Sequence, residues 1–336
     1  MERQKIVARP FLFLPFLFLL GLLFLSPTAL AAGPIKPKNV LLLFEGGPGQ
    51  ALYDITLSEV RATIQKGLDG PLNLYVEYLD AERFPEKHHV QAECDFIKRK
   101  YTKERIDLFI PVGPRILPLI SQYLSPNFDE IPTVFIEFRG GYPDGPPIDR
   151  KPNMTGLITE PHLKKTFEMT LSLHPGTREV FIITGSAPVD RFMERLARVA
   201  FREYEDRLKV TYLSGLTMQE LSQKISSLPK NSVGIYLGFT QDAAGVTYYG
   251  VESLKLLSEA SSVPLYSIFE MLIGRGIVGG YAVGLRENAV RVGQLALRIF
   301  QGEHPNMIPV TKGSMLYMFD WKEMKRWGIQ ERHLPE

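Results

Sequence analysis

The chain has 336 residues, of which 39 are basic and 37 acidic, so its formal net charge is +2. This balance argues against a nucleic-acid partner, which favours a strongly basic face. Cys94 is the single cysteine, so no internal disulfide can form, and a chain of this length can bury a sufficient core without one. The length suits two lobes of the usual ~150 residues each.

The N-terminus has the three parts of a secretory signal peptide. Three basic residues stand among the first nine, residues 11–25 form an uncharged apolar run, and Ala29-x-Ala31 supplies the small residues that signal peptidase requires. The run is shorter than the ~20 apolar residues of a spanning helix, and no cysteine follows it that could carry a lipid anchor. We therefore predict that residues 1–31 are cleaved near Ala31 and that the protein is periplasmic. An uncleaved N-terminal anchor is the alternative.

Beyond this segment, short apolar runs alternate with helical patterns, which is typical of βαβ units and parallel sheets. Residues 40–44 (VLLLF) predict a buried strand, and the turn 45–49 leads into a helix over 54–66. The same alternation predicts strands over 72–79, 107–112 and 133–138, and helices over 89–100 and 116–123.

Residues 140–152 have three Gly and four Pro in thirteen positions, and we interpret them as a loop or linker. The alternation of strands and helices then starts again. It predicts helices over 163–172, 189–204, 218–227 and 247–260, and strands over 179–184, 209–213, 233–237, 264–268 and 277–283. The predicted fold is therefore α/β, with two doubly wound parallel-sheet lobes.

The last elements indicate how the lobes are joined. An amphipathic helix over 287–301 is closed by Gly302 and precedes a short strand over 307–310. A strand–helix–strand so late in the chain can cross between the lobes and form a multi-strand hinge over a cleft. We assign residues 38–155 and 284–304 to the first lobe, and residues 156–283 and 305–336 to the second.

The glycine-rich turn at 46–50 follows a strand and precedes a helix, a position where phosphate-binding loops occur. It matches neither G-x-G-x-x-G nor G-x-x-x-x-G-K-[ST], so the Lys and hydroxyl that hold nucleotide phosphates are missing. Two interpretations stay open: a tight strand-to-helix turn, or a turn whose backbone N–H groups line the cleft. In the second interpretation, Gly47 and Pro48 contact the ligand.

Polar residues follow the third and fourth predicted strands, where ligands of open α/β sheets bind. Gly113 ends the third strand, and Arg115 and Arg139 come just beyond the two strand ends. A guanidinium there suits a ligand carboxylate, although a solvated loop charge is equally consistent with the pattern. Glu137 lies near the cleft, where an amine can meet it.

The second lobe offers equivalent positions after its own strands. Ser186 follows the strand over 179–184, and we interpret it as a helix-capping hydroxyl whose loop donates hydrogen bonds to the ligand. The aromatic residues suit a ring-bearing or apolar ligand by stacking, with core packing as the alternative for each Phe. The candidate ligand-binding residues of this lobe are Ser186, Ala187, Phe239, Asp242, Phe269 and Tyr281.

Two alternatives, an α/β hydrolase-like enzyme and a metal site, find weaker support in the sequence. The stretch around Ser186 lacks the second Gly of a G-x-S-x-G nucleophile elbow, and the nearby His162 and His174 each lie beside a proline. The neighbours His88 and His89 point to different sides of a helix, so they cannot join Cys94 in one metal site. We expect neither catalysis nor a metal or other cofactor.

The region from about 38 to 320 resembles the ABC-type solute-binding proteins with the type I periplasmic-binding fold, a broad group that includes tryptophan- and tyrosine-type binders. The resemblance rests on NMTG at 153–156, HPGT at 174–177, TGSAP at 184–188 and the block from GIVGGY at 276–281 to GEHP and IPV at 302–310. It implies a two-lobed binding protein that closes on a small solute and delivers it to a membrane permease. The mixture of Arg, Glu and aromatic candidates fits an amino-acid-like ligand without requiring one.

The segment FDWKEMKRWGI at 319–329 and the following Leu334-Pro335 resemble the end of the extracytoplasmic sensor region of certain membrane histidine kinases. The resemblance implies a second option, a ligand-sensing module read by a sensor kinase. The residues do not choose between permease and kinase.

Overall fold

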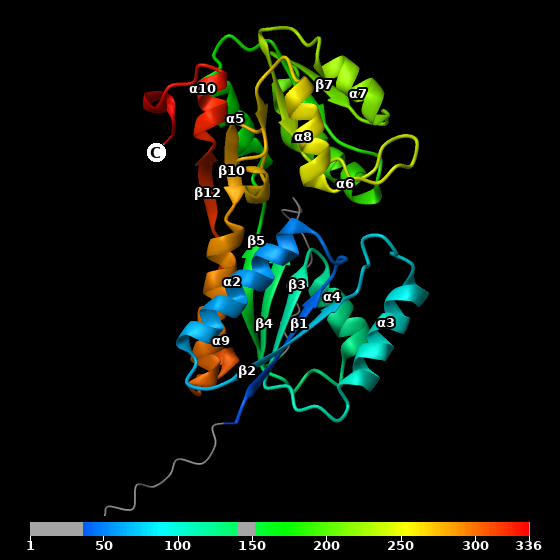
Figure 1. The fold of residues 1–336 in the computed structure, drawn as a ribbon, viewed down its shortest axis with the longest axis vertical. Coiled ribbons are helices and arrows are strands. Elements are labelled where there is room, and N and C mark those ends of the chain that lie inside the picture. The colour runs from blue at the N-terminus through cyan, green and yellow to red at the C-terminus, as the bar shows by residue number, and fades with distance from the viewer. Residues whose placement is uncertain (1–35, 140–151, 336) are drawn as a thin grey trace, which may run out of the picture. The chain divides into compact units, whose positions relative to one another are not determined.

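The computed structural model describes residues 36–139 and 152–335, and its main compact unit begins at Pro37. The predicted signal peptide and nearly all of the predicted linker lie outside the described residues. The described strands form two six-stranded sheets, each with helices on both faces (Figure 1). The prediction of two α/β lobes built on parallel sheets is confirmed. None of the described helices is both long and apolar enough to cross a membrane.

The first sheet has the strand order β11-β5-β4-β3-β1-β2, and all neighbouring strands are parallel. Its central strands are apolar on both faces because helices cover both sides. Val40 and Leu42 enter one core, and Leu41 and Leu43 enter the other. The strands are β1 (Lys38–Phe44), β2 (Leu72–Tyr78), β3 (Leu108–Gly113), β4 (Thr133–Phe138), β5 (Met154–Thr159) and β11 (Thr311–Lys312).

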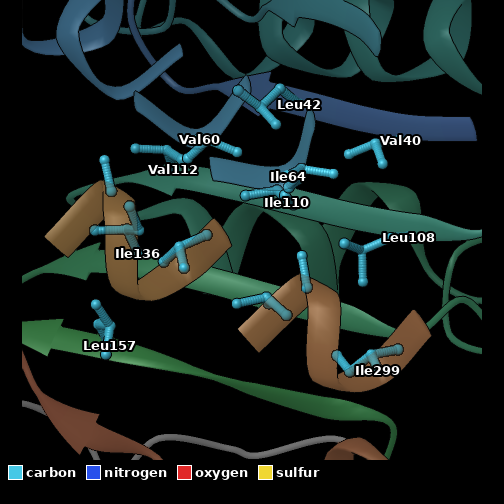
Figure 2. Packing of buried hydrophobic residues seen from close by; sticks show 14 of the residues in the cluster. Val40, Leu42, Val60, Ile64, Leu108, Ile110, Val112, Ile136, Leu157 and Ile299 are labelled. Carbon is cyan, nitrogen blue, oxygen red and sulfur yellow. The ribbon is translucent and has the colours of Figure 1, made fainter. Parts of the chain in front are cut away.

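One face of this sheet is covered by two helices that are far apart in the sequence. Helix α2 (Ala51–Gly67) lies beside α9 (Leu285–Phe300) (Figure 1). Figure 2 shows the core under them, where Val60 and Ile64 of α2 and Ile299 of α9 pack over the strands. The other face is covered by α3 (Lys87–Lys100), α4 (Ile116–Leu119) and the π-helical turn η2 (Ile120–Leu124).

The second sheet has the order β12-β10-β9-β8-β6-β7, parallel except for β12, which runs antiparallel to β10. The sequence did not predict β12. The strands are β6 (Glu179–Ile183), β7 (Lys209–Leu213), β8 (Ser232–Tyr236), β9 (Leu265–Tyr266), β10 (Gly279–Val283) and β12 (Met315–Phe319).

Helices cover both faces of the second sheet as well. One face packs on α5 (Leu163–Leu173) and α6 (Pro188–Phe201), and the other on α7 (Met218–Ile225) and α8 (Gly250–Ala260). Helix α10 (Trp321–Arg326) packs at the end near β9 and β10 through Met324. The remaining short turns are η3 (Arg202–Tyr204), η4 (Glu270–Leu272), η5 (Pro305–Met307) and η6 (Glu331–His333).

The described chain passes between the two sheets after β5, after β10, and between β11 and β12, so the predicted multi-strand hinge is confirmed. The buried Asn288 at the start of α9 ties two of these crossings together, because its Oδ1 accepts a hydrogen bond from the N–H of Ser314 (2.6 Å). The N–H of Gly284 donates to the carbonyl of Ser314 (3.0 Å). A Cβ on Gly313 would lie 2.1 Å from Thr159 Oγ1, so the crossings approach one another closely.

The pairing of two strands differs from the boundaries predicted for the lobes. β5 and β11 pair in the first sheet, whereas the prediction puts residues 156–159 and 311–312 in the second lobe. Neither β5 nor β11 was predicted as a strand from the sequence, and a local pattern does not show which sheet a strand joins. The strand predicted over 307–310 is wrong, because η5 ends at Met307 and β11 begins at Thr311. The remaining lobe assignment stays a prediction.

We expect the stability of the second lobe to fall in mild acid because of His174. Its Nε2 lies 2.7 Å from the hydroxyl of Tyr266, and burial lowers the pKa of His174 below its usual value. The unfolded chain therefore binds a proton more readily, so the free energy of unfolding should decrease as the pH falls through about 6.5. Urea unfolding as a function of pH measures this decrease. In His174→Gln the free energy of unfolding should decrease less over the same pH range.

Candidate functional site

At the carboxyl edge of the first sheet, β1 runs directly into Glu45, which is 0% exposed. Its two carboxylate oxygens accept hydrogen bonds from the backbone N–H (2.6 Å) and the Nε (2.9 Å) of Arg115, which follows β3. Burial raises the pKa of Glu45, and the hydrogen bonds and charge of Arg115 oppose that rise. A Cβ on Gly113 would lie 2.3 Å from the Cβ of Glu45. Two predicted site residues, Gly113 and Arg115, thus pack against a buried acid.

The glycine-rich turn packs against a second acidic loop. Gly47 is buried, and a Cβ there would lie 2.6 Å from Asp80 Oδ1, whereas Pro48 is exposed. The N–H of the preceding glycine donates to the hydroxyl of Tyr53 (3.1 Å), which in turn donates to Glu82 (3.1 Å). The structure therefore shows a tight strand-to-helix turn held by carboxylates and a tyrosine hydroxyl.

Glu137 is the next-to-last residue of β4 and is 6% exposed. Its Oε1 accepts a hydrogen bond from Arg139 Nε (3.3 Å), while its Oε2 has no hydrogen-bond partner within the described part of the chain. Burial raises the pKa of Glu137, and the charge and hydrogen bond of Arg139 oppose that rise. Glu137 pairs with Gly113 across the two strands, so it lies in one row with the Glu45–Arg115 pair.

At the carboxyl edge of the second sheet, Asp190 joins two loops. Its buried carboxylate accepts hydrogen bonds from the N–H groups of Ala187 (3.0 Å), Thr240 (3.0 Å) and Gln241 (3.2 Å) and from the Thr240 hydroxyl (2.9 Å). Burial raises the pKa of Asp190 and these hydrogen bonds oppose the rise. Helix α6 begins at Pro188, with Ala187 at its N-cap position, so the prediction that Ser186 caps the helix is wrong. The backbone N–H of Ser186 donates instead to the carbonyl of Gln241 (2.6 Å).

Asp242 organises the loop that follows β8. It is buried, and its Oδ1 accepts hydrogen bonds from the N–H groups of Ala244 and Val246, both at 2.9 Å. Burial acts to raise the pKa of Asp242, but the backbone hydrogen bonds outweigh it and lower the pKa below its usual value. Phe239 is a fully buried core residue whose ring lies 5.8 Å from that of Tyr248. For Phe239, core packing is the role that the structure shows.

The two remaining predicted aromatic residues also make internal contacts. Phe269 is half-buried and packs against both cores of the second lobe. Tyr281 lies within β10 beneath α5, where Lys165 Nζ sits 4.0 Å from the ring centroid and the ring of Tyr317 is 4.8 Å away. This cation–π contact occupies one face of the Tyr281 ring.

Among the described residues, the two lobes approach each other at the glycine-rich turn and near the hinge. A Cβ on Gly49, in the turn of the first lobe, would lie 3.8 Å from the ring of Tyr249, at the end of the loop after β8. Near the hinge, Arg286 Nη1 is 2.7 Å from a carboxylate oxygen of Glu59 on α2, and its Nε is 3.5 Å from one of Glu270 in the second lobe. Loops from both sheets therefore face a common region.

The residues considered for catalysis and metal binding lie apart from this region or from one another. His174 bonds to Tyr266, and the ring of His162 lies 6.0 Å from that of Tyr281. Cys94 is in the core of the first lobe, where burial raises its pKa to about 12, while His88 is exposed. Within residues 36–139 and 152–335, no group of three or more His, Cys, Asp or Glu side chains is spaced to hold a metal ion.

The fold is shared with solved binding proteins at low sequence identity. A ligand-free, open substrate binding protein, CD0873 from Clostridium difficile, has a TM-score of 0.62 at 14% identity, covering 88% of this chain and 96% of that one. An ABC domain from Streptococcus pneumonia in complex with L-Trp has a TM-score of 0.59 at 12% identity, covering 90% of this chain and 97% of that one. A carbohydrate transporter from Acidothermus cellulolyticus in complex with myo-inositol has a TM-score of 0.55 at 13% identity, covering 89% of this chain and 100% of that one.

Two lobes with six-stranded sheets in the described residues, parallel except for β12 and joined by a multi-strand hinge, define a protein of the type I periplasmic-binding fold. The profile of one sequence family, described as ABC transporter substrate binding protein, matches residues 75–331. The chain belongs to this family. No curated protein matches it.

Sequence reasoning missed two acids that organise the site. Glu45 stands at the end of the first strand, and a carboxylate directly after an apolar strand was the available signal. Asp190 comes two residues after Pro188, where an acid in the first turn of a helix is favoured. Both became recognisable only when their partners, about 50 or 70 residues away, were placed beside them.

Proposed function

We propose that this protein is the solute-binding component of an ABC-type importer, that it works outside the cytoplasm, and that it holds a small, amino-acid-like solute without catalysis. The observation that carries the proposal is that the chain belongs to the ABC transporter substrate binding family and has polar loops at both carboxyl edges. Ligands of open α/β sheets bind at such edges.

The proposed contacts are the predicted residues that stand at these edges. In the first lobe they are the turn at Gly47 and Pro48, together with Gly113, Arg115, Glu137 and Arg139. In the second they are the loop of Ser186 and Ala187. Asp242, Phe239, Phe269 and Tyr281 support this region through the internal contacts described above.

Solute uptake in this proposal proceeds by closure about the hinge. Contacts from both lobes are complete only in the closed state, so a bound solute shifts the population toward closure. The permease then recognises the closed form.

A ligand-sensing module for a membrane histidine kinase is the second candidate. It is favoured by the resemblance of the C-terminal segment, whose residues Met324, Trp327 and Leu334 pack against the second lobe. Solute binding is common to both candidates. Cross-linking in membranes of the source cell separates them, because the partner recovered is a permease subunit in one case and a kinase in the other.

The proposed location rests on the signal-peptide pattern of residues 1–31. N-terminal sequencing of the exported protein checks it. A start at Ala32 supports cleavage, and a start at Met1 supports an uncleaved anchor.

A thermal-shift screen with amino acids, sugars and nucleobases tests the binding function. A solute present at about 100 times its Kd stabilises the folded protein by about 2.7 kcal/mol. At about 2 °C or more per kcal/mol, the expected rise in Tm is about 5 °C. Chromatography after incubation should recover the solute unchanged. Product formed from an ester panel, and lost in Ser186→Ala, would contradict a purely binding role.

A further inference from the structure

Four buried side-chain atoms have no hydrogen-bond partner in the described residues, and two of them lie at the carboxyl edges. One is Oγ1 of Thr184, the residue directly after β6. The other is Oε2 of Glu137, near the end of β4. Folded proteins pair nearly all buried polar groups, so an unpaired one calls for an explanation. Of these two, only the oxygen of Glu137 belongs to a group that can carry a charge.

The unpaired oxygen of Glu137 lowers the stability of the folded protein when no solute is bound. An unmade hydrogen bond to a buried charged group costs more than one to a neutral group. Arg139 offsets part of this cost, but it reaches only Oε1, at 3.3 Å. The described residues therefore leave the second oxygen without a donor.

The neighbouring charges do not supply that donor. Arg115 follows the adjacent strand, where its backbone N–H and its Nε donate to Glu45. None of its nitrogens makes a hydrogen bond to Glu137 Oε2. Gly113, the residue directly opposite Glu137, has no side chain, so it places no donor over Glu137. Glu45 fills the space above Gly113 with another carboxylate.

We infer that Glu137 is a specificity-determining residue, and that the bound solute carries a protonated nitrogen that donates a hydrogen bond to Glu137 Oε2. This rests on the proposed solute-binding function and names the class of solute. A cation supplies both the missing donor and a compensating charge, and charge-assisted hydrogen bonds are the stronger kind. A polyol supplies only the donor, and a dicarboxylate adds a repelling charge.

The fold alone does not determine which class of solute the protein binds. The similar structures in complex with L-Trp and with myo-inositol share this architecture at 12% and 13% identity. Glu137 separates the two chemistries: amines and amino acids are accepted, and sugars and inositols are rejected.

Matched pairs of solutes test the inference by isothermal titration calorimetry at neutral pH. The probes are L-amino acids against the 2-hydroxy acids of the same side chain, putrescine against 1,4-butanediol, and xylose and myo-inositol as neutral solutes. The members that bind should carry a protonated nitrogen, and each hydroxyl counterpart should bind about 10- to 100-fold more weakly, as expected for one charge-assisted hydrogen bond.

Glu137→Gln should weaken binding of the amine about 10- to 100-fold and leave the hydroxyl counterpart nearly unchanged. Glu130→Gln is the matched control, since Glu130 is exposed in the same lobe. Cooperative thermal unfolding of both variants shows that they are folded. Tight binding of a neutral solute, unaffected by Glu137→Gln, would overturn the inference and leave the binding function standing. Failure of every solute class to bind would contradict both.

Discussion

Replacing Asp190 with alanine is expected to destabilise the fold by about 3–5 kcal/mol, because a buried donor left without its acceptor costs about 1–3 kcal/mol. The substitution removes the acceptor from the N–H groups of Ala187, Thr240 and Gln241. It also removes the carboxylate that joins the loop after β6 to the loop after β8, and leaves backbone hydrogen bonds such as that from Ser186 to Gln241 (2.6 Å). Solute affinity should therefore fall along with stability, and both are measured on one preparation by urea unfolding and calorimetry.

Asp206→Ala is the matched control for Asp190→Ala, because Asp206 is exposed and lies in the same lobe. Its free energy of unfolding should stay within about 0.5 kcal/mol of the native value. A loss of less than about 1 kcal/mol in Asp190→Ala would contradict the role assigned to Asp190, since an exposed carboxylate would behave in that way.

Arg115→Met is expected to destabilise the protein by about 2–3 kcal/mol at neutral pH. Removing one partner of a buried ion pair costs about 3–5 kcal/mol, and we lower this figure because the side chain of Arg115 is 58% exposed. The variant leaves the charge of Glu45 buried with only a backbone N–H as its partner. Urea unfolding of the solute-free protein measures the loss.

The second arm of this experiment separates the charge of Glu45 from its packing. In Glu45→Gln/Arg115→Met the buried charge at position 45 is gone, so the double variant should recover more than half of the loss. The pH dependence has a definite sign. Because burial raises the pKa of Glu45, its charge penalises the folded state above that pKa. The deficit of Arg115→Met should therefore shrink as the pH falls toward 4.5. A deficit independent of pH would point to lost packing instead.

Local patterns predicted most of the fold, because they record which faces are buried. The VLLLF run at 40–44 predicted a strand that has helices on both sides, and β1 has that environment. Pairing was harder to predict. Nothing in the residues of β5 or β11 shows which sheet they join. β12 was missed although its sequence, MLYMF, is an apolar run of the kind that predicts a strand.

The site was predicted by position more reliably than by role. Residues after strands do lie at the carboxyl edges, because parallel strands place their ends together. Their roles depend on partners that are distant in sequence. Arg115 was interpreted as a ligand contact, and its backbone N–H and Nε hold Glu45. Tyr281 was one of the predicted ligand contacts, and its ring lies against Lys165 on α5.

A crystal structure with a bound solute shows whether loops of both lobes and Glu137 contact the same molecule. We predict a small molecule with atoms within about 3.2 Å of polar groups from both carboxyl edges. One of these contacts should be a protonated nitrogen on Glu137 Oε2. A solute bound on the outer face of one lobe, with Glu137 untouched, would contradict the account.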